Sequence, residues 1–320
     1  MNTYTIAQRM LNAAICAYSI DLDGGFKPEA KYYDTLNLEN DPTVIVEGKD
    51  GINACFVGTT REDSVTGEKW IVLSLRGTLG SFKWSSWKSI HAFLEDWLQD
   101  DESKMEPFEV NGSCIGNATK GFKRAMMSLW SDIQSALSNI DLSQYTGIQI
   151  AGHSKGAALT FLAAALIKAS FSEMASIHVH AYAAPLAGDP KFASWYNDHN
   201  LDASTTRYQR ADDIVPFLPP SKEWNIFHHL PNTFHPKGIL LESVLKLLSL
   251  QVYGGYQEVG TLVGLTTEDK GGKVITNAEV ILQQSITHAI SHGRGGNIAS
   301  AHSAIDSYWP AMFNEKQNEE

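Results

Sequence analysis

A serine between two glycines is the group in this sequence best suited to chemistry: Ser154 lies in the pentapeptide Gly152-His153-Ser154-Lys155-Gly156. Before it, Ile148 and Ile150 alternate as in a short buried strand, and the Ala-rich run 157–168 is typical of a tightly packed helix. A strand that turns directly into a helix holds its serine in a sharp turn, and the glycines let the two backbones approach. The pattern predicts a nucleophilic hydroxyl, although a serine before a helix is also an ordinary N-cap.

A nucleophilic serine needs a base to take its proton and a carboxylate to hold that base in one tautomer. In α/β-hydrolases the acid and then the histidine follow the serine along the chain. Asp212 and Asp213 come at the end of a predicted strand, before a Pro-rich loop, where an α/β sheet carries working residues. Alternative candidates for the acid fall in predicted loops and are Asp189, Asp198 and Asp202.

The base has to come from the histidines that follow this acid. They are His228, His229, His235, His288, His292 and His302. His302 is distinctive because a Gly-rich stretch leads to it and a final predicted helix follows it. The residue pattern by itself leaves the choice among the six open.

Charge and composition exclude several classes of function. The formal net charge of -11 and the pI near 5.4 argue against nucleic-acid binding, because no basic surface would neutralise phosphates. No apolar run reaches the length of a membrane span. Three cysteines are too few for a disulfide framework, and Cys16 and Cys55 are expected to be buried free thiols.

Residues 1–20 lack the basic start and apolar centre of a signal peptide and instead carry a broad helical stripe. We therefore expect a cytoplasmic protein or one exported by a non-classical route. The remaining predicted elements are a loop at 22–40, an antiparallel meander of runs 43–47, 52–58 and 69–75, a helix at 117–139, strands at 177–183 and 205–210, a hairpin of 257–265 with 272–276, and a last helix after His302. Together they predict a single α/β domain over residues 1–320, with a disordered tail at 314–320.

A tryptophan-rich stretch follows the third run of the meander. In this stretch, which includes the candidate lid 81–97, an apolar face is widened by Phe82 and is formed at helical spacing by Trp84, Trp87, Ile90, Leu94 and Trp97. Such a face is either packed permanently on the core or part of a lid that contacts lipid when open. Both interpretations stay open from the residues alone.

Several motifs taken together resemble the fungal-type, or class 3, triacylglycerol lipases. These motifs are Arg76-Gly77-Thr78 after a strand, the segment GHSKGAAL, the strand AYAAP, the string DIVPFLPP and a late histidine, and they extend from about residue 32 to 309. The resemblance implies an α/β-hydrolase fold with a central, mostly parallel sheet, an antiparallel N-terminal meander, helices on both faces and a helical lid at 81–97.

The same resemblance implies roles for individual residues. Ser154 matches the nucleophile, Asp213 the triad acid and His302 the base. Backbone N–H groups of Thr78 and Lys155 match the oxyanion hole, and no metal or cofactor is implied. Family members commonly have Leu where Lys155 stands, and their usual disulfides are not evident here.

The implied activity is carboxylic-ester hydrolysis through an acyl-enzyme, with a triacylglycerol lipase favoured by the aromatic stretch. Phospholipase A1 and soluble carboxyl or feruloyl esterase share this machinery, and a non-catalytic lipase-like interaction protein is the alternative outside enzymes. The partners expected are a lipid or other ester substrate and a lipid–water interface. Acyl-chain length, head group and oligomeric state are not indicated by the sequence.

Overall fold

A seven-stranded sheet is the central element of the computed structural model, which describes residues 4–47, 52–78, 104–210, 213, 215–217, 255–265 and 301–314. In spatial order its strands are β1 (Thr43–Val46), β2 (Ala54–Thr59), β3 (Trp70–Leu75), β6 (Gly147–His153), β7 (Ile177–Tyr182), β8 (Thr205–Arg210) and β9 (Thr261–Leu265). The first three pair antiparallel and all later pairs are parallel. This is the α/β-hydrolase sheet, with its N-terminal meander, that the sequence predicts.

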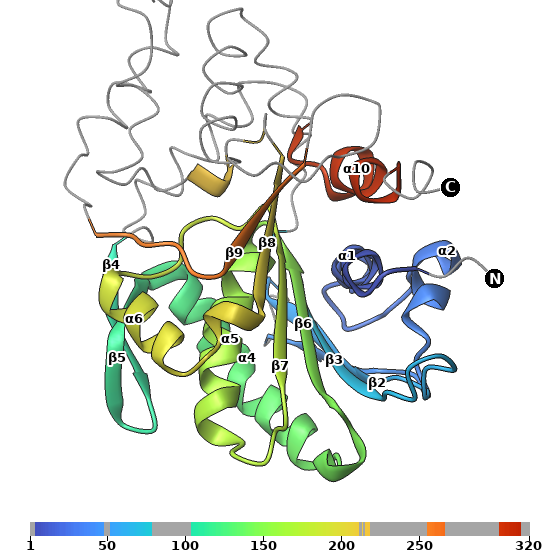
Figure 1. Ribbon diagram of the computed structural model, residues 1–320, viewed down its shortest axis with the longest axis horizontal. Helices are drawn as coiled ribbons and strands as arrows, with labels where there is room; N and C mark the ends of the chain where they lie inside the picture. The colour runs from blue at the N-terminus through green and yellow to red at the C-terminus, as the bar shows by residue number, and fades with distance from the viewer. Residues whose placement is uncertain are drawn as a thin grey trace, which may run out of the picture.

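Helices cover both faces of the sheet (Figure 1). On one face lie α4 (Lys120–Ser138), α5 (Lys155–Ser170) and α6 (Pro190–Asp198), and on the other lie α1 (Ile6–Ala17) and α10 (Trp309–Asn314). Each face has its own cluster of buried apolar side chains, because successive side chains along a strand point to opposite faces of the sheet. The central strands are therefore apolar on both sides, as expected of a parallel sheet.

Short helical turns replace part of the loop predicted at residues 22–40. The structure has α2 (Ala30–Tyr33) and a 3-10 turn (Asp34–Leu36) there. Elements of three or four residues are too short to show periodicity in a sequence, and here the burial of Tyr32 and Leu36 holds them in place. Further single turns are η2 (Leu142–Gln144), η3 (Asp202–Ser204), η4 (Val215–Phe217) and the π-helical turn η6 (Ala304–Tyr308).

A separate two-stranded ribbon, β4 (Met105–Val110) with β5 (Ser113–Thr119), corrects the start predicted for the following helix. Residues 117–119 belong to β5, and α4 begins at Lys120 rather than at 117. The turn between the strands, Asn111-Gly112, has positive φ at both residues, which is the usual hairpin signal. That dipeptide could have revealed the hairpin.

Other predictions concern residues outside those described. β9 pairs in parallel with β8, and the second strand of its predicted hairpin, 272–276, lies outside the described residues. So do the candidate lid 81–97 and residues 315–320 of the predicted tail. The single domain over 1–320 stays a prediction. Cys16 and Cys55 are buried free thiols as expected.

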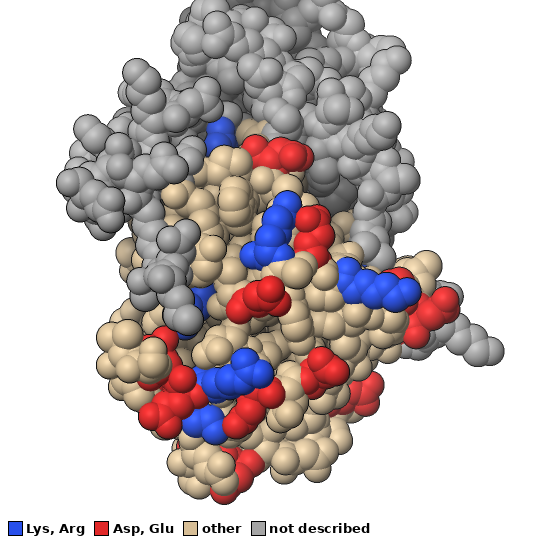
Figure 2. All heavy atoms as spheres, turned by 90° about the vertical axis from the view of Figure 1, so that its right-hand side faces the viewer, with Lys and Arg blue, Asp and Glu red and all other residues tan. Residues whose placement is uncertain are grey.

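Charged side chains of both signs are interspersed on the face that carries α1 and α2 (Figure 2). Two ion pairs of the described residues illustrate this mixture: Arg9 Nη1 lies 3.1 Å from Asp63 Oδ2, and Lys31 Nζ lies 3.0 Å from Glu29 Oε2. Surface pairs of this kind contribute little to stability, because water and salt screen the two charges. Because the signs alternate, the face drawn has no broad basic patch.

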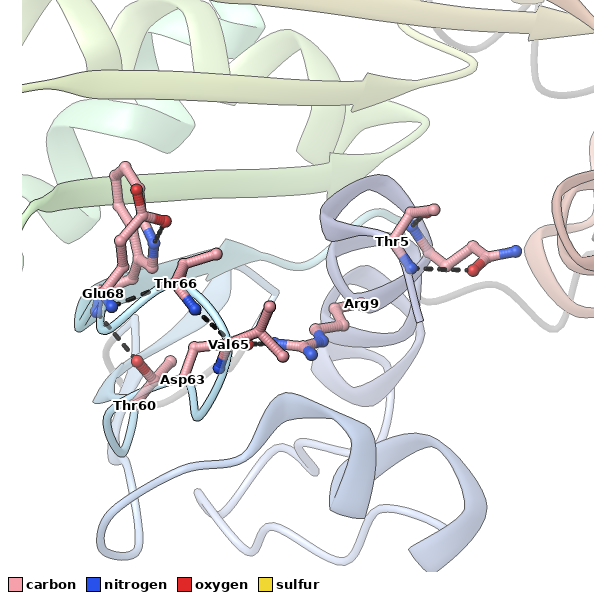
Figure 3. Close-up of polar contacts among 9 residues, drawn as sticks. Thr5, Arg9, Thr60, Asp63, Val65, Thr66 and Glu68 are labelled. Carbon is pink, nitrogen blue, oxygen red and sulfur yellow. Dashed lines mark hydrogen bonds and ion pairs between the residues drawn. The ribbon is translucent and has the colours of Figure 1, made fainter. Parts of the chain in front are cut away.

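The first helix is fixed at its N-terminus and along its side (Figure 3). Thr5 and Gln8 form a capping box, in which each side chain accepts a hydrogen bond from the other's backbone N–H. Arg9 reaches Asp63 in the β2–β3 connection, where Asp63 Oδ1 also accepts the backbone N–H groups of Val65 and Thr66. This docking matters for the site, because α1 ends beside the nucleophile turn.

Candidate active site

Ser154 lies in the strand–turn–helix that the sequence predicts, between β6 and α5. Its backbone is strained, with φ 59° and ψ -129°, a region that non-glycine residues rarely adopt. The flanking glycines are required by contact: a Cβ at Gly152 would lie 2.4 Å from the backbone of Gly156, and one at Gly156 would lie 2.2 Å from the Leu75 carbonyl oxygen. The turn therefore holds the hydroxyl in one orientation at the carboxyl edge of the sheet.

A chain of hydrogen bonds connects the serine to a histidine and an aspartate. His302 Nε2 lies 2.8 Å from Ser154 Oγ, and His302 Nδ1 lies 2.9 Å from Asp213 Oδ2. All three residues are buried: Ser154 is 5% exposed, His302 is 2% exposed and Asp213 is 0% exposed. Because they follow β6, precede η6 and follow β8 respectively, only the folded sheet brings them together. The geometry can activate a serine for acyl transfer.

Of the competing candidates for the acid and the base, some lie among the described residues and the others lie outside them. Asp189 caps α6 by accepting the Phe192 N–H, and Asp202 accepts the Gly260 N–H, so both stabilise the backbone. Asp198 is an exposed residue at the end of α6. The remaining candidates lie outside the described residues and are Asp212, His228, His229, His235, His288 and His292.

Sequence reasoning missed Tyr308, which is fully buried beside the acid. Its hydroxyl donates to Asp213 Oδ2 at 2.8 Å and accepts the Arg210 N–H at 3.1 Å. The Val215 N–H donates to the other carboxylate oxygen at 3.0 Å. Burial and the Asp213 charge raise the pKa of Tyr308 well above its usual value, so the phenol stays protonated and keeps donating.

Replacing Tyr308 by Phe should lower kcat about tenfold, because a hydrogen bond to a buried charged group stabilises it by roughly 1.5–3 kcal/mol. The loss falls on kcat because the carboxylate has its greatest effect when the histidine is charged. Steady-state kinetics on an ester substrate measure it, with Trp309→Phe in the next position as the matched control. An unchanged kcat in a folded Y308F variant would show that the phenol only fills space.

Two further rings lie against the base. His153 Nδ1 lies 2.9 Å from the Tyr18 hydroxyl at the end of α1, and the His153 and His302 rings are 4.8 Å apart between centroids. Burial, followed by the proximity of His302, lowers the pKa of His153 well below 6.5. His153 is therefore neutral near pH 7 and places no positive charge beside a base that must itself become charged.

The two candidate oxyanion residues flank the serine turn. Thr78 follows the end of β3 and is partly exposed, and Lys155 is the first residue of α5, where backbone N–H groups have no partner within the helix. Strands β3 and β6 are neighbours, with Leu75 opposite Gly152. The oxyanion roles stay predictions, and the lid candidates Phe82, Trp84, Trp87 and Ile90 lie outside the described residues.

The chain is 30% identical over 140 residues to the secreted mono- and diacylglycerol lipase 3 of Gibberella zeae. The matched region covers 43% of this chain and 41% of that protein. The chain thus matches about two fifths of the length of this curated relative. No helix among the described residues is long and apolar enough to cross a membrane.

Solved structures support the fold. A Rhizomucor miehei lipase–propeptide complex superposes with a TM-score of 0.53 at 17% identity, covering 81% of this chain and 67% of that one. The N225Q mutant of MDLA from Penicillium cyclopium gives 0.53 at 20% identity, covering 85% and 83%. At these identities the likeness shows the fold alone. Residues 73–223 match the family described as Lipase (class 3), so this region of the chain is similar to the class 3 lipases.

Proposed function

We propose that the chain is a serine carboxylic-ester hydrolase, and specifically a triacylglycerol lipase. The observation that carries the proposal is the buried hydrogen-bonded chain from Ser154 through His302 to Asp213, with the serine in a strained turn. A hydroxyl in ordinary use as a helix cap would accept a backbone N–H, and Ser154 makes no such side-chain cap bond. The family match adds support from a different kind of evidence.

The first half of the reaction forms an acyl-enzyme. His302 Nε2 takes the proton of Ser154 Oγ as that oxygen attacks the ester carbonyl carbon, and the carbonyl electron pair moves onto oxygen. Backbone N–H groups of Thr78 and Lys155 donate to this oxyanion. When the tetrahedral species collapses, the ester C–O bond breaks and His302 returns its proton to the departing alcohol.

Hydrolysis completes the cycle. A water molecule gives a proton to His302 and attacks the acyl carbon, so that a second tetrahedral species forms. Its collapse breaks the bond to Ser154, releases the carboxylic acid and returns the proton to the serine oxygen. Asp213 holds His302 Nδ1–H in position throughout and stabilises the charged imidazole.

The substrate proposed is an acylglycerol, and the site of action is a lipid–water interface. The curated relative is named for mono- and diacylglycerols, and the tryptophan-rich residues 81–97 would supply an apolar contact surface. That relative is also named as secreted, and cell fractionation would distinguish export of this chain from a cytoplasmic location.

A hydrolysis profile tests the substrate proposal. Purified protein would be given triacylglycerols and p-nitrophenyl esters of increasing chain length, each below and above its solubility limit. We expect turnover to rise sharply once the triacylglycerol forms an emulsion. Fatty-acid release from phospholipid with none from triacylglycerol would favour phospholipase A1, and equal rates below and above the solubility limit would favour a soluble esterase.

A further inference from the structure

Residues Ile52–Ala54, at the start of β2, contact both segments that carry the candidate oxyanion donors. On one side the Arg76 N–H donates to the Ala54 carbonyl at 2.9 Å, and Arg76 Nη2 donates to the Ile52 carbonyl at 3.1 Å. On the other side Lys155 Nζ donates to Asn53 Oδ1 at 2.7 Å. Arg76 is fully buried and Asn53 is 7% exposed, whereas Ile52 and Lys155 are exposed or partly exposed, so these bonds are partly shielded from water.

The Lys155 ammonium thus has a hydrogen-bond partner within the protein, the Asn53 side chain. Asn53 is itself held, since its Nδ2 donates to Glu47 and, at 3.4 Å, to Ser128 Oγ. Burial lowers the pKa of Lys155 to about 8; nearby Arg76 and Arg124 lower it as well, and Glu47 opposes them. The Lys155 side chain is thus partly buried and directed at Asn53.

The two donor segments also touch each other directly. A Cβ added at Gly156 would lie 2.2 Å from the Leu75 carbonyl oxygen and 3.0 Å from the Gly77 nitrogen. Backbone packs on backbone here, so neither segment can move without shifting the other. The bond from Lys155 to Asn53 adds a second attachment for the first turn of α5.

We propose that Lys155 is a positioning residue, whose side chain fixes the first turn of α5 to β2 and so holds its own backbone N–H at the oxyanion, a role that rests on the proposed function. Oxyanion donors work at 2.7–3.1 Å, so a small displacement weakens them. The first N–H groups of a helix have no partner within it, so the first turn is held by fewer helical hydrogen bonds than the turns that follow. Tying that turn to Asn53 limits its movement.

Substitution of either partner tests the proposal. We expect Lys155→Met and Asn53→Ala each to lower kcat about tenfold, less than the loss of a whole donor, with KM within about twofold. Both changes remove the same hydrogen bond, between Lys155 and Asn53. The double variant should therefore be no slower than the slower single variant. Lys168→Met, at an exposed lysine in the last turn of the same helix, is the matched control and should leave both constants unchanged.

Labelling of Ser154 by an alkyl phosphonate separates this proposal from the proposed function. The phosphonate counts competent sites, so kcat is expressed per labelled serine even if a variant is partly unfolded. A wild-type protein that is not labelled would overturn the proposed function itself. Labelled variants with wild-type kcat, or with a changed KM for charged head groups alone, would leave that function standing and overturn the positioning role.

Discussion

Ser154→Ala should lower kcat for ester hydrolysis about a million-fold, the size of loss measured when a serine nucleophile is removed from a triad. Without Oγ no acyl-enzyme can form, and His302 Nε2 loses the group that lies 2.8 Å from it. The residual rate would reflect only binding and the oxyanion donors acting on water. Initial rates on a p-nitrophenyl ester, with the variant's thermal unfolding recorded in parallel, measure this.

Ser74 supplies the matched control for that change. It is a fully buried serine on β3, the strand beside β6, and its hydroxyl has no hydrogen-bond partner among the described residues. Ser74→Ala should therefore keep wild-type turnover and be neutral or slightly stabilising, because it removes a buried unsatisfied group. If Ser154→Ala retained full activity while remaining folded, the nucleophile would have to be another residue.

Asp213→Asn should reduce kcat about ten-thousand-fold, the effect of the same change in a serine protease triad. The carboxylate oxygen Oδ2 accepts from both His302 Nδ1 and the Tyr308 hydroxyl, and Oδ1 accepts the Val215 N–H. An amide has one accepting oxygen and one donating nitrogen, so it cannot satisfy all three donors. If its nitrogen faces the histidine, the ring must take the wrong tautomer to accept that bond.

Asp212 provides the matched control for Asp213, because the two aspartates are adjacent in the sequence. Asp212→Asn makes the same chemical change one residue earlier and should leave kcat within about twofold, because this carboxylate has no part in the proposed mechanism. Both variants would be assayed at a fixed pH and checked for folding by circular dichroism. The opposite outcome, with Asp212→Asn inactive and Asp213→Asn active, would move the triad acid by one position.

Local patterns in the sequence predict much of the fold because their signals lie within short windows. The alternation at 148 and 150, the glycines at 152 and 156 and the Ala-rich run after them define strand, turn and helix without reference to the rest of the chain. The antiparallel meander is predicted in the same way. Where signals are short or overlooked, the prediction is wrong, as for the turns at 30–36 and the β4–β5 ribbon.

The candidate site depends on contacts between distant segments, and here the sequence only narrows the choice. From the residues alone six histidines compete, and the likeness to class 3 lipases selects His302. In the structure this residue bonds Ser154 across 148 positions of sequence. Such a contact follows from the order of strands β6, β7 and β8 in the sheet, which no short window records.

The residues by themselves thus predicted the reactive turn, since residue type and spacing carry that chemistry, and the resemblance to class 3 lipases implied the α/β-hydrolase fold and the candidate acid and base. Only the tertiary structure decided what surrounds it: Tyr308 on the acid, Tyr18 on His153, and the direction of the Lys155 side chain toward Asn53. A long side chain can take many rotamers, and which one is stable depends on partners supplied by other strands and helices.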